Sequence, residues 1–436
     1  MKRVSEERTA GEEIAESAFS PDTYRPQLSD IQRAKQRIGN VVQQTPLSKN
    51  YPLSERYGAD VWLKREDMQQ VRSYKIRGAY NKISSLSPER LACGVVCASA
   101  GNHAQGVALA AANLGACAVI FMPKPTPKQK IRQVKMFGRD NVEIVLTGDT
   151  YDDACAEAMA YCEERGAAFI HPFDDPLIIE GQGTAALDIL NDTKKPIDYM
   201  LLPIGGGGLA AGVASVFKAI SPETKVIGVE AAGAPCMKKS FEAGRIVTLD
   251  EIDTFADGIA VRTPGEITFR ICRALLDDIL VVPEGKICTT ILELYNESAI
   301  VVEPAGAASV AALSLLGDTI RDKRVVCLIS GSNNDITRME EIKERSMLYE
   351  GLKHYFIVRF PQRAGALREF LEKVLGPNDD ITLFQYAKKN AREKGPAIVG
   401  IEVRAPEDFT PLLARMDEQH IVYEYLNDKP DLLRLI

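Results

Sequence analysis

Short apolar runs alternate with longer amphipathic stretches along most of the chain. The runs have the length and composition of buried strands, and the stretches between them repeat apolar residues at helical spacing. The runs that we interpret as strands cover residues 59–64, 94–97, 118–122, 142–146, 199–204 and 226–230. Strands and helices in alternation predict an α/β fold with parallel sheets covered by helices. Ligands of such folds bind at the carboxyl ends of the strands, so the residues after each run are the first candidates for function.

The N-terminal part of the chain departs from this alternation. Residues 1–27 are polar and show no apolar period, so we expect a mobile tail. Ser29 then has the residue type of a helix N-cap, and Ile31, Ala34 and Ile38 line one face of the short helix that it would begin. The packed part of the chain is therefore expected to begin with this helix.

A second pattern starts beyond the charged stretch 342–345, where the sequence predicts a break. The predicted strands are 353–360, 381–387, 397–403 and 421–426, the predicted helices are 365–375 and 409–419, and a charged turn covers 388–395. The order β-α-β-β-α-β is that of a ferredoxin-like α+β domain. We therefore divide the chain after the tail into a domain at 28–350, with a smaller subdomain at about 60–170 inserted in a larger one, and a C-terminal domain at 351–436.

Composition and charge are those of an ordinary soluble globular protein. Hydrophobic residues make up 45% of the chain and charged residues 26%, and the net charge of -7 argues against binding nucleic acid through bulk electrostatics. No apolar run reaches the length of a membrane span. The N-terminus lacks the apolar core of a signal peptide and carries too many glutamates for a transit peptide, so we expect a cytoplasmic protein. The nine cysteines show no Cys-x-x-Cys spacing, so neither a disulfide framework nor a zinc site is indicated.

The stretch around Lys75 is the first candidate for chemistry. Ser73-Tyr74-Lys75-Ile76-Arg77-Gly78-Ala79 follows the predicted strand 59–64 and precedes a helical pattern at 80–86. An amine just inside a helix start lies near the partly positive end of the helix dipole, where the ammonium form is disfavoured and anions are attracted. This environment suits a lysine that forms a Schiff base with a phosphorylated aldehyde. An ordinary surface lysine is the alternative, and the stretch alone does not exclude it.

A run of four glycines is the second candidate. The residues are Gly205, Gly206, Gly207 and Gly208, and Leu209 follows them. The run lies between the predicted strand 199–204 and a predicted helix at 209–220, where backbone N–H groups without side chains in front of them can bind a phosphate. A dinucleotide fingerprint is the alternative, but four consecutive glycines lack the G-x-G-x-x-G spacing. Two further loops also follow predicted strands: Ser99-Ala100-Gly101-Asn102-His103-Ala104-Gln105-Gly106 and Ser330-Gly331-Ser332-Asn333-Asn334.

These four motifs, in this order, resemble those of the fold-type II family of pyridoxal-phosphate (PLP) enzymes. Within that family the chain is most similar to the threonine dehydratases, and the resemblance runs from about Asp30 to the C-terminus. It implies two parallel-sheet subdomains with helices on both faces, a bound PLP and a C-terminal ACT-like regulatory domain, as in the biosynthetic form of the enzyme. The chain has room for one such unit, whereas the long form of the enzyme carries two.

The resemblance assigns a role to each motif. Lys75 would bind the cofactor as a Schiff base and then abstract the substrate α-proton. Asn102 would hydrogen-bond the 3′ oxygen of the pyridine ring, and Ser330 would face the ring nitrogen. The cofactor phosphate would lie on Gly205, Gly206, Gly207, Gly208 and Leu209, and the substrate carboxylate on Ser99, Ala100, Gly101 and His103. For His103, a capping or core role is an equally good interpretation.

Several positions bear on the type of reaction. Ala100 stands where the related serine racemases have a second serine, which argues for elimination and against racemisation. Ser330 would be a neutral partner for the ring nitrogen, which suits β-elimination better than transamination. Glu303 precedes a stretch that matches a core helix of the family, and a helix-start role is at least as good an interpretation as a catalytic one. Cys236 replaces the aspartate of a cation site that includes Glu230 in some relatives, so we expect no metal.

The resemblance therefore implies that the protein dehydrates L-threonine to 2-oxobutanoate and ammonia, the first step of isoleucine biosynthesis. Feedback by isoleucine, with valine as a second candidate effector, is expected at the turn after strand 353–360, through Arg363, Gly365 and Leu367. A purely structural turn is the alternative. A catabolic threonine or serine dehydratase and a non-catalytic amino-acid sensor are the rival functions. A homodimer or homotetramer is expected, with no nucleic-acid or membrane partner.

Overall fold

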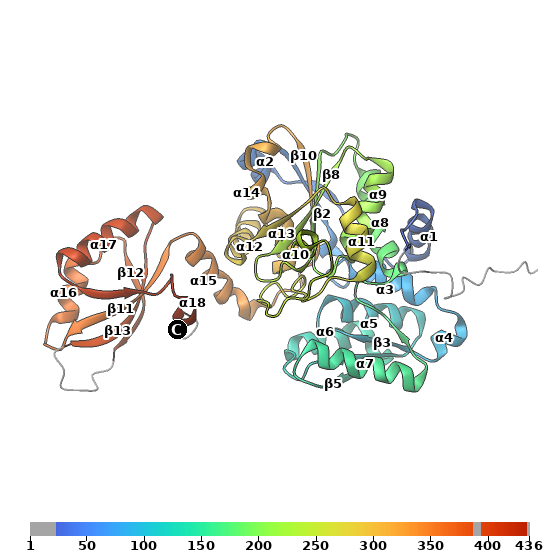
Figure 1. Cartoon of the computed structure of the whole chain (residues 1–436), viewed down its shortest axis with the longest axis horizontal. Helices are drawn as coiled ribbons and strands as arrows, with labels where there is room; N and C mark the ends of the chain where they lie inside the picture. The colour runs from blue at the N-terminus through green and yellow to red at the C-terminus, as the bar shows by residue number, and fades with distance from the viewer. Residues whose placement is uncertain (1–22, 387–393, 434–436) are drawn as a thin grey trace, which may run out of the picture.

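The computed structural model describes residues 23–386 and 394–433 (Figure 1). Within these residues the strands form one six-stranded sheet, order β1-β2-β10-β7-β8-β9, and two four-stranded sheets, orders β5-β4-β3-β6 and β12-β13-β11-β14. Figure 1 shows the first two sheets in one body of the molecule and the third in a separate C-terminal domain. The predicted α/β architecture with an added α+β domain is therefore confirmed.

The six-stranded sheet is parallel apart from its first strand, which is antiparallel to the second. Its strands are β1 (Leu47–Lys49), β2 (Asp60–Arg65), β7 (Tyr199–Pro203), β8 (Lys225–Ala231), β9 (Asp278–Val282) and β10 (Arg324–Ile329). Alternate residues of each strand enter different cores. Val325 and Cys327 lie in one cluster of buried side chains, whereas Val326 and Leu328 lie in the other. This alternation is why the strands read as continuous apolar runs in the sequence.

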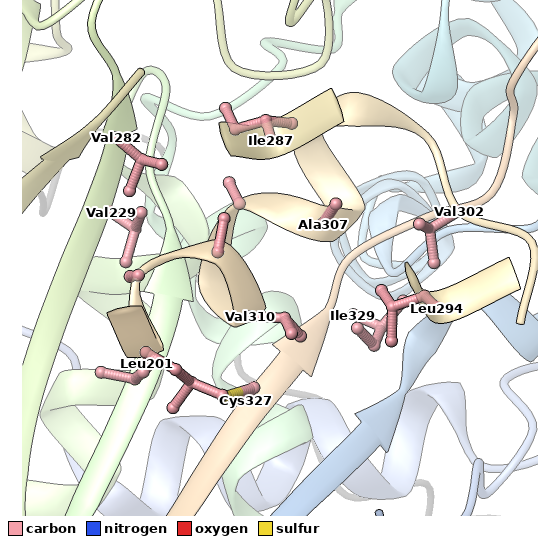
Figure 2. Close-up of a cluster of buried hydrophobic side chains, with 14 of the residues drawn as sticks. Leu201, Val229, Val282, Ile287, Leu294, Val302, Ala307, Val310, Cys327 and Ile329 are labelled. Carbon is pink, nitrogen blue, oxygen red and sulfur yellow. The ribbon is translucent and has the colours of Figure 1, made fainter. Parts of the chain in front are cut away.

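Helices cover both faces of this sheet. One face carries α1 (Leu28–Ile38), α8 (Pro176–Asp192), α9 (Gly208–Ile220), α10 (Cys236–Ala243) and α11 (Glu266–Leu275). The other face carries α2 (Tyr51–Tyr57), α12 (Glu284–Ser298), α13 (Pro304–Ala311), α14 (Leu313–Leu316) and α15 (Met339–Tyr349). Figure 2 shows the second core, in which Ala307 and Val310 of α13 meet Leu201 and Cys327 of the sheet. Small side chains let α13 approach the sheet so closely that the Ser309 hydroxyl donates to the Leu328 carbonyl at 2.9 Å.

The smaller sheet is wholly parallel and has its own helices. Its strands are β3 (Val95–Ala98), β4 (Ala118–Met122), β5 (Val142–Leu146) and β6 (Ala168–Phe169), and its helices are α3 (Lys75–Ser84), α4 (Pro88–Ala92), α5 (Asn102–Leu114), α6 (Lys128–Gly138) and α7 (Tyr151–Arg165). The predicted strand 59–64 belongs elsewhere, since β2 pairs with β10 of the larger sheet. We therefore propose that the smaller subdomain begins after β2, later than the predicted residue 60.

The C-terminal domain has the predicted β-α-β-β-α-β order. Its elements are β11 (Lys353–Pro361), α16 (Ala366–Lys373), β12 (Asp380–Tyr386), β13 (Lys394–Glu402), α17 (Phe409–Glu418) and β14 (Val422–Tyr425), followed by α18 (Pro430–Leu433). All neighbouring strands are antiparallel. Residues 387–393 of the predicted charged turn lie outside the described residues. The ferredoxin-like prediction is confirmed by this topology.

Two helix boundaries differ from the prediction. Helix α1 begins at Leu28 with Gln27 as its N-cap, not Ser29, because the Gln27 N–H donates to the Asp30 carboxylate at 2.8 Å. The predicted break at 342–345 lies inside α15, and the left-handed turn follows at Gly351, φ +68. We propose the domain boundary at that glycine.

The predicted tail is only partly described. Residues 1–22 lie outside the described residues, but Tyr24 is buried and its hydroxyl donates to the Glu180 carboxylate at 2.8 Å. We propose that the packed chain begins near Tyr24, before the predicted residue 28. No helix among the described residues combines the length and apolar character that a membrane crossing requires.

Candidate active site

Lys75 is the first residue of α3, so the helix begins five residues earlier than the pattern at 80–86 predicted. Its Nζ donates to the Pro172 carbonyl oxygen at 2.8 Å. Burial lowers the pKa of Lys75 to about 8, although the Glu303 carboxylate acts in the opposite direction. The helix N-terminus adds a partly positive environment. The amine is therefore much closer to its neutral, nucleophilic form at physiological pH than an exposed lysine would be.

The glycine run joins β7 to α9, and α9 begins at Gly208. Backbone N–H groups of residues 205–209 donate to no backbone oxygen in the described part of the chain. A Cβ on Gly206 would lie 2.3 Å from the Phe173 ring, and Gly207 has φ +96, which side chains disfavour. Free N–H groups at a helix start, with no space for side chains, form an anion-binding loop.

Asn102 opens α5 and connects the smaller sheet to α13. Its Nδ2 donates to Glu303 Oε1 at 2.7 Å, and its Oδ1 accepts a hydrogen bond from Asn333 Nδ2. The Asn333 backbone N–H donates to the second oxygen of Glu303 at 3.2 Å. Glu303 is the N-cap residue of α13 by position, but its carboxylate makes no capping bond and instead joins these two asparagines. Burial, together with the charge of Asp257, raises the pKa of Glu303 to about 7.

Ser330 directly follows β10 and is buried. Its carbonyl accepts the Tyr74 N–H at 3.1 Å, and the Ser332 N–H donates to the Arg72 carbonyl at 2.9 Å. These bonds hold the 330–334 loop against the residues just before Lys75. The Ser330 hydroxyl makes no hydrogen bond to any described residue, so it is free to meet a ligand.

The loop after β3 places the predicted carboxylate residues at the start of α5. The Ser99 hydroxyl accepts the Gly101 N–H at 3.2 Å, and Ala100 and Gly101 are half-buried. N–H groups of Ala100, Asn102 and His103 find no backbone acceptor among the described residues. These amides could bind a carboxylate, as the sequence predicts.

The His103 side chain lies in the core, which favours the alternative interpretation of this residue. It is 3% exposed, and its Nε2 lies 2.7 Å from the Ile170 carbonyl oxygen. Burial lowers the pKa of His103 to about 3, so the ring is neutral and donates from Nε2. Its contribution to a carboxylate site would come from the backbone N–H.

Glu230 does not present an open cation site. Its two carboxylate oxygens accept the N–H groups of Met237 and Lys238, each at 2.8 Å, at the start of α10. Cys236 stands beside them, as the sequence indicates. No group of three or more potential metal-ligating side chains occurs among the described residues.

The predicted regulatory residues lie between β11 and α16. Arg363 is exposed and pairs with both oxygens of Glu369, at 2.9 and 2.6 Å. Gly365 has φ +86 and precedes α16, and Leu367 is 40% exposed. A small cavity beside this turn is lined by Arg363 and Glu369, with His420 on its far side, but not by Gly365 or Leu367.

Sequence reasoning missed several residues that shape this site. Pro172 and Phe173 belong to the turn-rich stretch His171-Pro172-Phe173-Asp174-Asp175, which follows a short apolar run and could have been recognised by that position. Arg77 is fully buried on α3, where it bonds Glu66 and Asp188. No local pattern predicts these partners, because they lie far from Arg77 along the chain.

Comparisons with known proteins agree with this geometry. Residues 38–331 match the pyridoxal-phosphate dependent enzyme family, and residues 344–436 match the C-terminal regulatory domain of threonine dehydratase. The chain is 56% identical over 410 residues to the biosynthetic L-threonine dehydratase IlvA of Bacillus subtilis, covering 94% of this chain and 97% of that protein.

Two solved structures extend the agreement to the fold. Processed threonine deaminase isoform 2 of Solanum lycopersicum is 41% identical with TM-score 0.69, covering 74% of this chain and 95% of that one. A second threonine deaminase, whose source is abbreviated T.th., is 40% identical with TM-score 0.68, covering 71% of this chain and 99% of that one. The chain therefore belongs to the biosynthetic threonine dehydratases, PLP-dependent lyases that carry a C-terminal regulatory domain.

Proposed function

We propose that this protein converts L-threonine to 2-oxobutanoate and ammonia with PLP held at Lys75. The observation that carries the proposal is the placement of the Lys75 amine. It lies at the start of α3, and burial lowers its pKa to about 8. Such an amine can exchange between a covalent bond to an aldehyde and a free base.

The residues of the site fit PLP in charge and shape. The 205–209 loop offers unpartnered N–H groups for a phosphate, and a Cβ at Gly206 or Gly208 would meet Phe173 within 3.0 Å. Asn102 and the free Ser330 hydroxyl offer partners for the polar atoms of a pyridine ring. The bound cofactor supplies the electron withdrawal that makes the substrate α-proton acidic.

Each residue would then have one task. Lys75 takes the α-proton, and the amides at residues 100–103 orient the substrate carboxylate. Glu303 holds Asn102 in place through the 2.7 Å bond and, with its raised pKa, carries less negative charge near the ring. Ala100 offers no hydroxyl that could return a proton to the opposite face, which favours elimination over racemisation.

We further propose that isoleucine regulates the reaction by binding at the cavity beside Arg363. A match to the threonine dehydratase regulatory domain and the charged cavity lined by Arg363 and Glu369 support an amino-acid effector. Valine is the second candidate, and assembly into a dimer or tetramer would complete the enzyme. Regulation requires that the effector bind one state of the enzyme better than the other.

The test is 2-oxo acid formation from L-threonine and from L-serine, with isoleucine titrated into the assay. We expect the Lys75→Ala enzyme to lose the visible absorbance of the bound cofactor and to be slower by at least about 100-fold, since general base catalysis alone contributes that much. Lys135→Ala, an exposed lysine on α6, is the matched control and should behave as wild type.

The outcomes separate the proposed function from its rivals. Faster turnover of serine than of threonine would favour the catabolic alternative. A purified wild-type protein that takes up no PLP would favour the sensor. Turnover that ignores isoleucine would contradict the regulatory part alone.

A further inference from the structure

A loop at residues 253–259 contacts the candidate active site on one side and α15 on the other. On the site side, a Cβ on Gly205 would lie 3.0 Å from the Ile259 backbone, and a Cβ on Gly258 would lie 2.7 Å from Ala305 and 3.6 Å from Glu303 Oε1. The backbone of this loop is therefore in close contact with the first residue of the anion-binding run and with the start of α13.

The same loop is clamped to α15 through Phe255. This side chain is 3% exposed, and the guanidinium carbons of Arg338 and Arg345 lie 4.9 and 4.4 Å from its ring centroid. Arg338 also donates to the Phe255 carbonyl at 2.9 Å, and Arg345 pairs with Asp253 at 3.2 Å. Two arginines on one aromatic ring, each with a second bond to the same loop, hold the loop at a defined position on α15.

Helix α15 also carries the contact to the C-terminal domain. Glu344, the residue before Arg345, forms an ion pair with Lys353 and accepts a hydrogen bond from the Tyr355 hydroxyl. Both partners lie on β11, the strand that leads to Arg363. Adjacent residues of one helix thus bind the regulatory domain and the active-site loop, and Figure 1 shows α15 between the two bodies.

We propose that Phe255 is a positioning residue: held by Arg338 and Arg345, it fixes the 253–259 loop against Gly205 and Glu303, and α15 passes the effector signal through it. The proposal rests on the regulation proposed above. It assigns to this clamp two separable consequences. One is retention of the cofactor in its loop, and the other is coupling between effector and substrate.

The test compares variants on either side of α15 in the holoenzyme. Phe255→Leu and Arg345→Met should speed loss of the visible cofactor absorbance on dilution into PLP-free buffer. They should also reduce, by at least about 5-fold, the factor by which isoleucine weakens threonine binding, a factor of the size expected for allosteric coupling. Glu344→Gln severs only the regulatory side, so it should reduce that factor while cofactor release stays at the wild-type rate.

Tyr161→Leu is the matched control, because the Arg165–Tyr161 pair, 5.8 Å apart, lies on α7 away from α15. It should match wild type in both measurements. Wild-type cofactor release in both Phe255→Leu and Arg345→Met would overturn the proposal, and so would full coupling in those variants. If isoleucine does not act on the wild-type enzyme, the proposed regulation fails, and cofactor release alone then decides whether Phe255 positions the loop.

Discussion

Replacing Arg77 with methionine would leave buried carboxylates beneath the catalytic helix without their cation. Arg77 donates to both oxygens of Glu66, at 2.8 and 2.7 Å, and to Asp188 at 2.8 Å. The side chains of Arg77 and Glu66 are 0% exposed, and that of Asp188 is 4% exposed. Methionine keeps an unbranched apolar side chain in the cavity, so the change removes charge and hydrogen bonds more than volume.

The two carboxylates would not be affected equally. Asp188 keeps its 2.5 Å ion pair with Lys35, whereas Glu66 keeps only hydrogen bonds from Thr45 and Gln69. Removing one partner of a buried ion pair costs about 3–5 kcal/mol. Because Asp188 retains a cation, we expect Arg77→Met to lower the free energy of unfolding by about 3 kcal/mol. Adding Glu66→Gln removes the orphaned charge and should restore at least about 1 kcal/mol of that loss.

Urea unfolding followed by fluorescence measures this directly, since Trp62 on β2 is the only tryptophan of the chain. Arg33→Met is the control, because Arg33 is 59% exposed in its pair with Asp30 and such pairs contribute at most about 1 kcal/mol. An Arg77→Met enzyme as stable as Arg33→Met would refute the reasoning, and so would a double variant no more stable than Arg77→Met.

The pH dependence gives a second check on the same variant. Burial alone would raise the pKa of Glu66, but Arg77 outweighs it and holds the pKa below the usual value. In wild type, Glu66 therefore contributes stability that is lost as the pH falls. Without Arg77 the burial effect dominates, and the native state gains stability from a protonated Glu66. The difference between wild type and Arg77→Met should consequently shrink as the pH is lowered.

Three further predictions concern other parts of the chain. Gly206→Ala places a Cβ 2.3 Å from the Phe173 ring, so we expect PLP affinity to fall at least about 10-fold in an absorbance titration, whereas Gly39→Ala, with contacts at 3.5 Å, should match wild type. Burial raises the pKa of Glu180 from 4.5 to about 7, so the native state keeps a proton that the unfolded state loses, and stability falls with rising pH in that window; Glu180→Gln should flatten this slope in thermal unfolding. Gly365→Ala at φ +86 should destabilise the C-terminal domain by about 1–2 kcal/mol and raise the isoleucine concentration needed for inhibition.

The sequence predicted the strands better than it predicted the starts of helices. Strands β4 and β5 have the predicted bounds, because each is an apolar run that ends at turn residues. Helix α3 was placed late, since Lys75 and Arg77 interrupt its apolar pattern. Their places are set by tertiary bonds, to Pro172 and to Glu66, that local spacing does not encode.

The candidate site divides in the same way. Lys75, the glycine run and Ser330 could be identified because each follows a strand in a distinctive local stretch. The role of Glu303 stayed open, since its position before α13 fits a helix start. Only the folded chain brings it to Asn102, which lies 201 residues away. The open choice for His103 required its ring contact with Ile170.

Glu303 is also the point at which the parts of the catalytic unit meet. Asn102 comes from the smaller sheet, Asn333 follows the last strand of the larger sheet, and Gly258 belongs to the loop clamped on α15. Helix α13 behind it is packed between the larger sheet and α12 with small side chains, so its first residue has little freedom to move (Figure 2). A displacement of the smaller sheet, or of the loop, must therefore alter the bonds of one fixed carboxylate. Substrate binding and effector binding would thus compete at Glu303, which links the two sites by contact.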